Sequence, residues 1–170
     1  MKPRRQLIGL PVATADGVFI AHYSDTGLAE LDFPKAGRGS VRAVKPRVIP
    51  AEILRWHSAT TKALKTILAG GEPKTFPPLD MAGTAFQKSV WNQMRRIATG
   101  KTKSYGEIAQ AIGRPKAVRA VGGACGANPI PVLVPCHRVL AANKKLGGFS
   151  GGLDWKRDLL AREGVSGFPG

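Results

Sequence analysis

Short apolar runs separated by turn-forming residues occupy the first third of the chain. Residues 7–13 and 18–23 carry closely spaced apolar side chains, and the Asp16-Gly17 dipeptide between them is typical of a β-hairpin turn. Residues 28–33 alternate apolar and polar positions, which predicts a third strand. Residues 35–50 combine Gly, Pro and basic residues without periodicity, so we expect a loop there.

A long helix is predicted after Pro50, because proline is favoured at the start of a helix. The Gly70-Gly71 pair ends it, and residues 72–79, with three prolines, form a linker. Together with the strands, this helix predicts a small α/β domain over residues 1–79. The apolar positions of the helix are Ile53, Leu54, Leu64, Ile67 and Leu68.

Helical periodicity dominates the second half of the chain. Thr84 and Gln87 have the spacing of a capping box, and Gly100 ends the helix that they begin. The apolar positions on one face of this helix are Phe86, Val90, Met94 and Ile97. We therefore expect a mainly helical domain over residues 80–170.

Two shorter helices joined by a tight turn follow. Ser104 and Glu107 form a second capping box, residues 113–115 form the turn, and residues 116–125 form the next helix. Helix, three-residue turn and helix make a helix-turn-helix pattern. A plain packing hairpin is the alternative interpretation.

The second helix of this pair presents small residues and a single arginine, Arg119. Helices that read the major groove present long polar side chains to the base edges. Small residues instead permit close approach, either to a narrow minor groove or to a neighbouring helix. Because Arg119 has no apolar role in the pattern, we interpret it as facing DNA.

Charge strengthens the interpretation as a nucleic-acid-binding protein. The formal net charge is +15 for 170 residues, which favours a polyanionic partner. Residues 81–170 hold 14 Lys and Arg against 4 Asp and Glu, so most of the excess lies in the helical half. We place the nucleic acid there.

Length and cysteine content narrow the class further. Apolar residues make up 43% of the chain, enough for a real core, and no apolar run is long enough to span a bilayer. The basic start of the chain lacks the apolar segment of a signal peptide. Two cysteines are too few for a disulfide scaffold, which favours a cytoplasmic protein with free thiols.

The run from Pro135 to Val139 places a thiol, an imidazole and a guanidinium inside an apolar segment, residues 129–140. A cysteine in such a segment is either an apolar filler or a nucleophile activated by a base. We expect the segment to be extended, so that the Cys136 and His137 side chains point in opposite directions.

Four motifs in order resemble the O6-alkylguanine-DNA alkyltransferases, the methylated-DNA–protein-cysteine methyltransferases. They are the helix-turn-helix, Asn128-Pro129, the run around Cys136, and residues 148–153, which read Gly-Phe-Ser-Gly-Gly-Leu. The resemblance extends over residues 84–164 and implies a ribonuclease H-like N-terminal domain and a winged-helix-like C-terminal domain. It implies direct-reversal DNA repair, in which one alkyl group passes irreversibly from O6-alkylguanine to a cysteine after base flipping.

The resemblance also assigns the chemistry. Cys136 matches the alkyl acceptor, and His137 matches the base that deprotonates it through a bridging water. Glu163 matches the carboxylate that orients the histidine, although the sequence alone favours a solvated glutamate at that position. Tyr105 matches the phenol that donates a proton to N3 of the flipped guanine.

Substrate and DNA contacts follow from the same resemblance. The carbonyls of Cys136 and Val139 match acceptors for the guanine amino group, and the Ser150 N–H matches a donor to O6. Asn128 matches a residue that holds the turn before the active-site segment, and Arg138 has a structural or DNA-contact role. Phe149 stands where many members have tyrosine. Arg119 matches the family's arginine that enters the base stack and fills the space of the flipped nucleotide, and the resemblance places its helix in the minor groove. We expect Ala117, Ala120 and Gly122 to lie beside Arg119 on the DNA-binding face.

No cofactor or metal is expected. Some members of the family bind zinc in the N-terminal part, but His22 and His57 alone cannot complete a tetrahedral site there. The expected partner is duplex DNA bound by a monomer, and O4-alkylthymine stays open as a second substrate. The alternatives are a transcription factor, a Cys-His hydrolase and a non-catalytic protein that recognises alkyl damage; Cys136 argues against the last of these.

Overall fold

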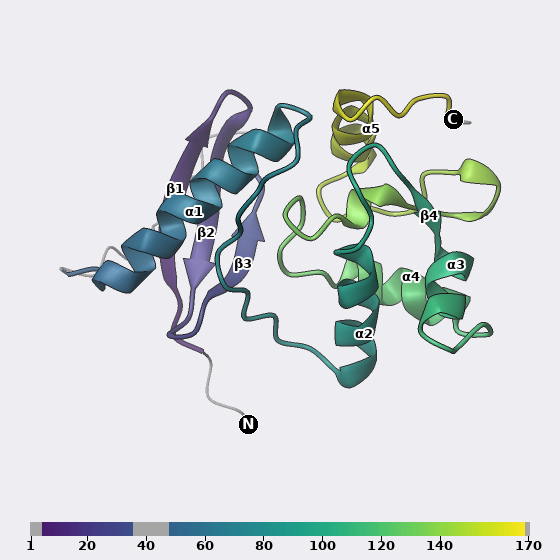
Figure 1. Cartoon of the computed structure of the whole chain (residues 1–170), viewed down its shortest axis with the longest axis horizontal. Coiled ribbons are helices and arrows are strands. Elements are labelled where there is room, and N and C mark those ends of the chain that lie inside the picture. Colours follow the sequence, from purple (N-terminus) through teal and green to yellow (C-terminus); the bar gives the residue numbers. More distant parts are fainter. Residues whose placement is uncertain (1–4, 36–47, 169–170) are drawn as a thin grey trace.

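A computed structural model describes residues 5–35 and 48–168 (Figure 1). A small sheet covered by one helix is followed by a mainly helical part, so the predicted fold class is confirmed at this level. The ribonuclease H-like and winged-helix-like descriptions, and the division at residue 79, stay predictions. Most of the loop predicted over residues 35–50 lies outside the described residues.

The sheet consists of β1 (Ile8–Thr14), β2 (Gly17–Tyr23) and β3 (Leu28–Asp32) in antiparallel order. The hairpin turn is Ala15-Asp16, one residue earlier than predicted, because Gly17 already pairs with Thr14. Gly17 has a φ of +116°, where a side chain would be strained, so this glycine serves as the first residue of β2. The Thr14 hydroxyl accepts from the Asp16 N–H at 3.1 Å and completes the turn.

Helix α1 (Ala51–Leu68) lies across one face of the sheet (Figure 1). Of the five apolar positions named from the sequence, four are buried, whereas Leu54 is 50% exposed. Leu54 is rotated about 100° around the helix from Ile53 and faces away from the strands. Gly70, with a φ of +80°, follows the end of the helix as expected.

The predicted linker is irregular, but its last residues are tied to β3. The Leu28 N–H donates to the Pro78 carbonyl, and the Asp80 N–H donates to the Leu28 carbonyl, each at 2.8 Å. The end of the linker therefore pairs with the outer edge of the sheet on its way to the helical part.

Helix α2 (Ala85–Met94) begins with the predicted capping box of Thr84 and Gln87. It ends six residues before Gly100, so the predicted C-terminus is wrong. The N–H groups of Arg96 and Ile97 bond to carbonyls three residues back, which tightens the chain into a turn. Ile97 is nevertheless buried, because this turn folds back onto the core.

The helix-turn-helix consists of α3 (Tyr105–Ala111) and α4 (Val118–Gly126), which pack against each other and against α2. The Ser104–Glu107 capping box is present. Helix α4 begins at Val118 rather than at residue 116, because the Ala117 N–H bonds to Arg114 in the preceding turn.

The apolar run over residues 129–140 is core, as predicted, but it is not extended at the cysteine. Cys136–Arg138 form a 3-10 turn, η1, and β5 (Val139–Leu140) then pairs in parallel with β4 (Lys103–Ser104). This pairing places the start of α3 beside the cysteine segment. A second 3-10 turn, η2 (Ala142–Lys144), and helix α5 (Leu153–Arg162) complete the chain.

One buried apolar cluster joins the two parts of the molecule, since it contains Phe19 and Leu64 as well as Met94, Val134 and Cys136. Across residues 5–35 and 48–168, no helix combines the length and apolar character needed to cross a bilayer.

Candidate active site

Cys136 is the first residue of η1 and is only 5% exposed. Burial raises the pKa of its thiol, while hydrogen bonding from Asn128 and the positive charge of Lys156 act in the opposite direction. A thiolate at this position therefore needs a nearby base and fixed donors to form at neutral pH.

Asn128 holds the loop that leads to the cysteine. Its side-chain amide donates to the Val134 carbonyl at 2.8 Å and accepts from the Ile130 N–H at 3.0 Å. Between these anchors Val132 has a φ of +74°, which a β-branched residue rarely adopts. The predicted turn-holding contact is thus present, and the strained valine is a feature that the sequence did not reveal.

His137 and Glu163 meet inside the protein although they lie 26 residues apart. The His137 Nε2 and Glu163 Oε1 atoms are 3.0 Å apart, and both side chains are buried. A solvated Glu163, which the sequence alone favoured, is therefore wrong. The carboxylate is at the C-terminal end of α5, where it reaches back to η1.

Arg138 completes this cluster. Its Nε donates to Glu163 Oε2 at 2.9 Å and its Nη2 donates to Oε1 at 2.8 Å, while Nη1 donates to the Ile97 carbonyl at 2.7 Å. Arg138 is 6% exposed, so its role is structural and the alternative of a DNA contact is wrong. It pairs with the carboxylate that also holds the histidine.

The cluster fixes the state of the imidazole. Burial alone would raise the pKa of Glu163, but hydrogen bonds from His137 and Arg138 outweigh it and lower the pKa to about 2. Burial lowers the pKa of His137 more than Glu163 raises it, so the ring is neutral at pH 7. A carboxylate only accepts, so Nε2 carries the proton and Nδ1 carries a lone pair.

The Nδ1 atom of His137 is buried, and no group among the described residues hydrogen-bonds it. A neutral imidazole with one nitrogen held by a carboxylate and the other free to accept a proton is the arrangement of a general base. His137 directly follows Cys136 in the chain, so the imidazole and the thiol share one turn.

Tyr105 is the first residue of α3 and lies between α4 and the loop at residues 147–148. A Cβ at Gly147 would be 2.5 Å from the Tyr105 hydroxyl, and a Cβ at Gly122 would be 3.8 Å from the ring. Burial raises the pKa of this phenol, so it keeps its proton at neutral pH. The two glycines leave space for the ring close to the cysteine segment.

The loop after Gly148 contacts the N-terminal part of the molecule. Phe149 is half-buried, and its ring meets Phe33 edge-on at a centroid distance of 5.7 Å. Ser150 is exposed, so its backbone N–H lies on an accessible segment. Through the contact with Phe33, the N-terminal part of the molecule therefore borders this loop.

Lys156 is a site residue that sequence reasoning missed. It is fully buried, and its Nζ donates to the Val139 carbonyl at 2.7 Å and to the Gly148 carbonyl at 3.2 Å. Burial lowers its pKa to about 8. Its position on the same face of α5 as the buried Leu159 and Leu160 was the available signal, because a lysine rarely occupies an apolar position without a partner.

The predicted DNA-binding residues lie on α4 and at its N-cap, and they differ in exposure. Arg119 and Ala120 are exposed, Ala117 and Gly122 are half-buried, and α4 packs on the core through Val121, Ala124 and Cys125. In residues 5–35 and 48–168, no acidic side chain forms an ion pair with Arg119. The arginine therefore stands on an exposed surface of small residues.

The two N-terminal histidines have protein partners. His22 Nε2 is 2.8 Å from Asp32 Oδ2, and His57 Nδ1 is 2.9 Å from the Tyr23 hydroxyl. Within the described ranges, no group of three His, Cys, Asp or Glu side chains has the arrangement of a metal site. The predicted absence of metal stays a prediction.

These features define a class: helix-turn-helix proteins in which the last helix delivers a carboxylate to a buried Cys-His pair. Residues 85–165 match the family described as "6-O-methylguanine DNA methyltransferase, DNA binding domain". A methylated-DNA–protein-cysteine methyltransferase of Methanosarcina acetivorans is 45% identical over 141 residues, covering 82% of this chain and 87% of that protein. The chain belongs to this methyltransferase family, and the resemblance stated from the sequence is confirmed.

Solved structures of related proteins superpose on nearly the whole chain. The crystal structure of Mycobacterium tuberculosis O6-methylguanine methyltransferase superposes with a TM-score of 0.71 at 35% identity, covering 93% of each chain. A structure of the same organism's protein in complex with DNA superposes with a TM-score of 0.70 at 35% identity, covering 90% of each chain. The likeness therefore includes the N-terminal sheet, where the sequence resemblance was weakest.

Proposed function

We propose that this protein repairs O6-alkylguanine in duplex DNA by moving the alkyl group irreversibly onto Cys136. The observation that carries this proposal is the buried cluster in which Glu163 holds Nε2 of His137, the residue that directly follows Cys136. Membership of the methyltransferase family and the DNA complex of the M. tuberculosis relative support it. No cofactor takes part.

Each atom of the reaction has a place in this proposal. The Cys136 proton passes to Nδ1 of His137 through a bridging water, and the thiolate attacks the alkyl carbon in line with the C–O6 bond. That bond breaks as the S–C bond forms, and the electron pair moves onto the guanine ring. Tyr105 gives its proton to N3, so guanine leaves as a neutral base. A thioether does not reverse, so each molecule acts once.

The alkylated base reaches the thiol only after it leaves the helix, because O6 lies inside the base stack. In the proposed complex a single protein monomer binds DNA, with α4 in the minor groove and its exposed small residues against the backbone. Arg119 enters the stack and fills the space of the flipped nucleotide. The walls of the base pocket are the carbonyls of Cys136 and Val139 and the loop of Phe149 and Ser150.

Incubation with a duplex that carries one O6-methylguanine tests the function directly. Intact-protein mass spectrometry should show a gain of one methyl group, in an amount that never exceeds the amount of protein. The DNA should regain an unmodified guanine at the same site. Tight binding of the damaged duplex without any mass gain would favour a protein that recognises alkyl damage without repairing it.

Replacement of Arg119 by alanine separates base flipping from chemistry. The variant should repair duplex DNA at least about tenfold more slowly, because the cost of unstacking, a few kcal/mol, is no longer offset by a side chain in the gap. Its reaction with free O6-benzylguanine should keep the wild-type rate, since a free base has no stack to leave. Both rates are measured by single-turnover mass spectrometry.

Lys116→Ala, in the turn before α4, is the matched control, because it removes a positive charge from the same exposed surface. It should weaken binding to DNA without a specific loss of repair at saturating DNA. Equal losses with duplex and free base in the Arg119 variant would assign this arginine to chemistry or folding instead.

A further inference from the structure

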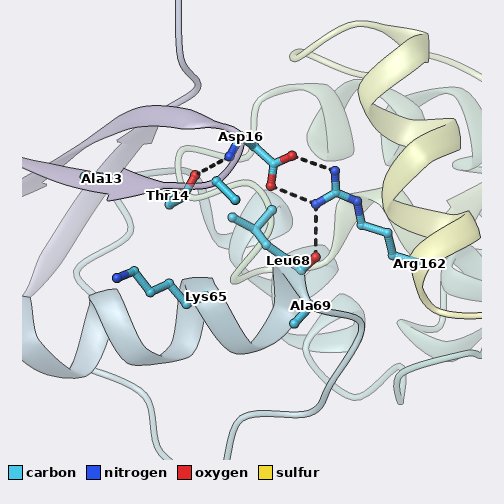
Figure 2. Close-up of a pocket in the computed structure, with 8 residues that line it drawn as sticks. Ala13, Thr14, Asp16, Lys65, Leu68, Ala69 and Arg162 are labelled. Atoms are coloured by element: carbon cyan, nitrogen blue, oxygen red, sulfur yellow. Dashed lines mark hydrogen bonds and ion pairs between the residues drawn. The ribbon is translucent and has the colours of Figure 1, made fainter.

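Arg162, the last residue of α5, binds the N-terminal part of the molecule. Figure 2 shows its guanidinium facing the β1–β2 turn, where Nη1 donates to Asp16 Oδ2 at 2.8 Å and Nη2 donates to Asp16 Oδ1 at 2.7 Å. Nη1 also donates to the carbonyl of Leu68, the last residue of α1, at 3.0 Å. One side chain thus connects three elements that lie far apart in the sequence.

The backbone at the same point is enclosed as well. A Cβ placed on Gly70 would be 2.3 Å from the Arg162 carbonyl oxygen, so the chain that leaves α1 lies directly against the end of α5. On the other side, a Cβ on Gly100 would be 3.2 Å from the Glu163 carbonyl oxygen. Two glycine turns therefore border the backbone of Arg162 and Glu163, one at each carbonyl group.

The next residue in the chain is the carboxylate of the active site. Glu163 holds His137 at 3.0 Å and Arg138 at 2.8 and 2.9 Å, distances that a displacement of 1 Å would break. We infer that the Asp16–Arg162–Leu68 contact positions Glu163, so that the N-terminal sheet takes part in alkyl transfer by holding the base His137. This inference rests on the proposed function.

The geometry favours a positioning role over an ordinary surface ion pair. The contact is bidentate, and the side chains of Arg162 and Asp16 are only 26% and 23% exposed. Hydrogen bonding from Arg162 lowers the pKa of Asp16, so the carboxylate is charged at neutral pH. Arg162 also bonds Asp158 at 2.6 Å, but that residue is on α5 itself and adds no connection to the sheet.

This second carboxylate provides a matched control. Asp16→Asn removes the charge that ties α5 to the sheet, whereas Asp158→Asn removes a charge from the same guanidinium and leaves that tie in place. Asp16→Asn should lower the rate of transfer at saturating DNA by about tenfold or more, because small misplacements of catalytic groups have effects of 10- to 100-fold. The DNA concentration at half saturation should not change, since α4 is untouched.

A second measurement does not depend on activity. In NMR spectra of the full chain, the Nε2–H proton of His137 should exchange with solvent about tenfold faster in Asp16→Asn than in wild type, and at the wild-type rate in Asp158→Asn. Both variants are compared well below their melting temperatures, so that global unfolding does not contribute.

The outcomes separate the inference from the function. Wild-type rates and exchange in Asp16→Asn, or equal losses in the two variants, would overturn the positioning role while leaving alkyl transfer intact. A wild-type protein that never gains an alkyl group would overturn the proposed function, and the exchange of the His137 proton would still decide whether Asp16 holds Glu163 in place.

Discussion

Replacement of Cys136 by alanine is expected to abolish alkyl transfer while leaving the affinity for duplex DNA unchanged. The thiolate is the only group proposed to form a bond with the alkyl carbon, and alanine offers no nucleophile. The side chain is small, buried and part of η1 rather than of α4, so its removal should leave the exposed residues of α4 in place. Single-turnover assays and binding measurements with O6-methylguanine duplexes check both expectations.

Cys125 is the control for this experiment. Its thiol is buried on α4, where Sγ donates to the Met94 sulfur at 3.5 Å, and burial raises its pKa to about 12. Cys125 therefore stays protonated at neutral pH and should remain unmodified, and Cys125→Ala should still accept the alkyl group. Transfer by Cys136→Ala, or a methylated peptide that contains Cys125, would contradict the assignment of the acceptor.

The Glu163→Gln variant is expected to lose alkyl transfer by a factor on the order of 10² to 10⁴, since the same acid-to-amide change in a Ser-His-Asp triad lowers kcat by about 10⁴ through the wrong histidine tautomer. Oε1 accepts from His137 and Arg138, and Oε2 accepts from Arg138. If the amide nitrogen of glutamine takes the place of Oε1, it faces the donors of both His137 and Arg138. If it takes the place of Oε2, it faces the Nε–H donor of Arg138. The first orientation also forces His137 into the tautomer with a proton on Nδ1.

The same substitution should lower the free energy of unfolding by about 3 kcal/mol, because it leaves the buried Arg138 charge without its partner. The folded-state pKa of Glu163 is about 2, below the ordinary value of 4.5. Its stabilising contribution is therefore complete above pH 4.5 and is lost as the pH falls towards 2. Urea unfolding across this range should show a steeper decline in wild type than in Glu163→Gln, since Asp16 and Asp80, whose pKa values are also lowered, contribute equally to both.

Glu163→Asp is a useful comparison, since it keeps the charge but shortens the reach by one methylene. It should retain more stability than Glu163→Gln while still transferring slowly, because the carboxylate no longer meets His137. Full activity of Glu163→Gln at neutral pH would show that His137 does not depend on this carboxylate for its tautomer.

Local patterns were sufficient where neighbours in the sequence decide the structure. The capping boxes at Thr84 and Ser104 predicted two helix starts correctly, because both partners of each box lie within one turn. Apolar runs on either side of a hairpin turn, together with alternation over residues 28–33, predicted the sheet. The ends of elements were less predictable: α2 ends at Met94 because the following turn folds onto the core, and no residue near Met94 signals this.

The order of motifs in the sequence determined the family, and it indicated Cys136 as the proposed acceptor and His137 as the proposed base. Only the tertiary structure decided what surrounds them. Glu163 is held by Arg138 as well as His137, Lys156 is buried between two carbonyls, and Asp16 reaches Arg162 across 146 residues. The physical reason is that, from the sequence alone, a charged side chain is expected to be exposed to water, because burying an unpaired charge is costly. It becomes a buried partner only when folding brings a complementary group within hydrogen-bond distance.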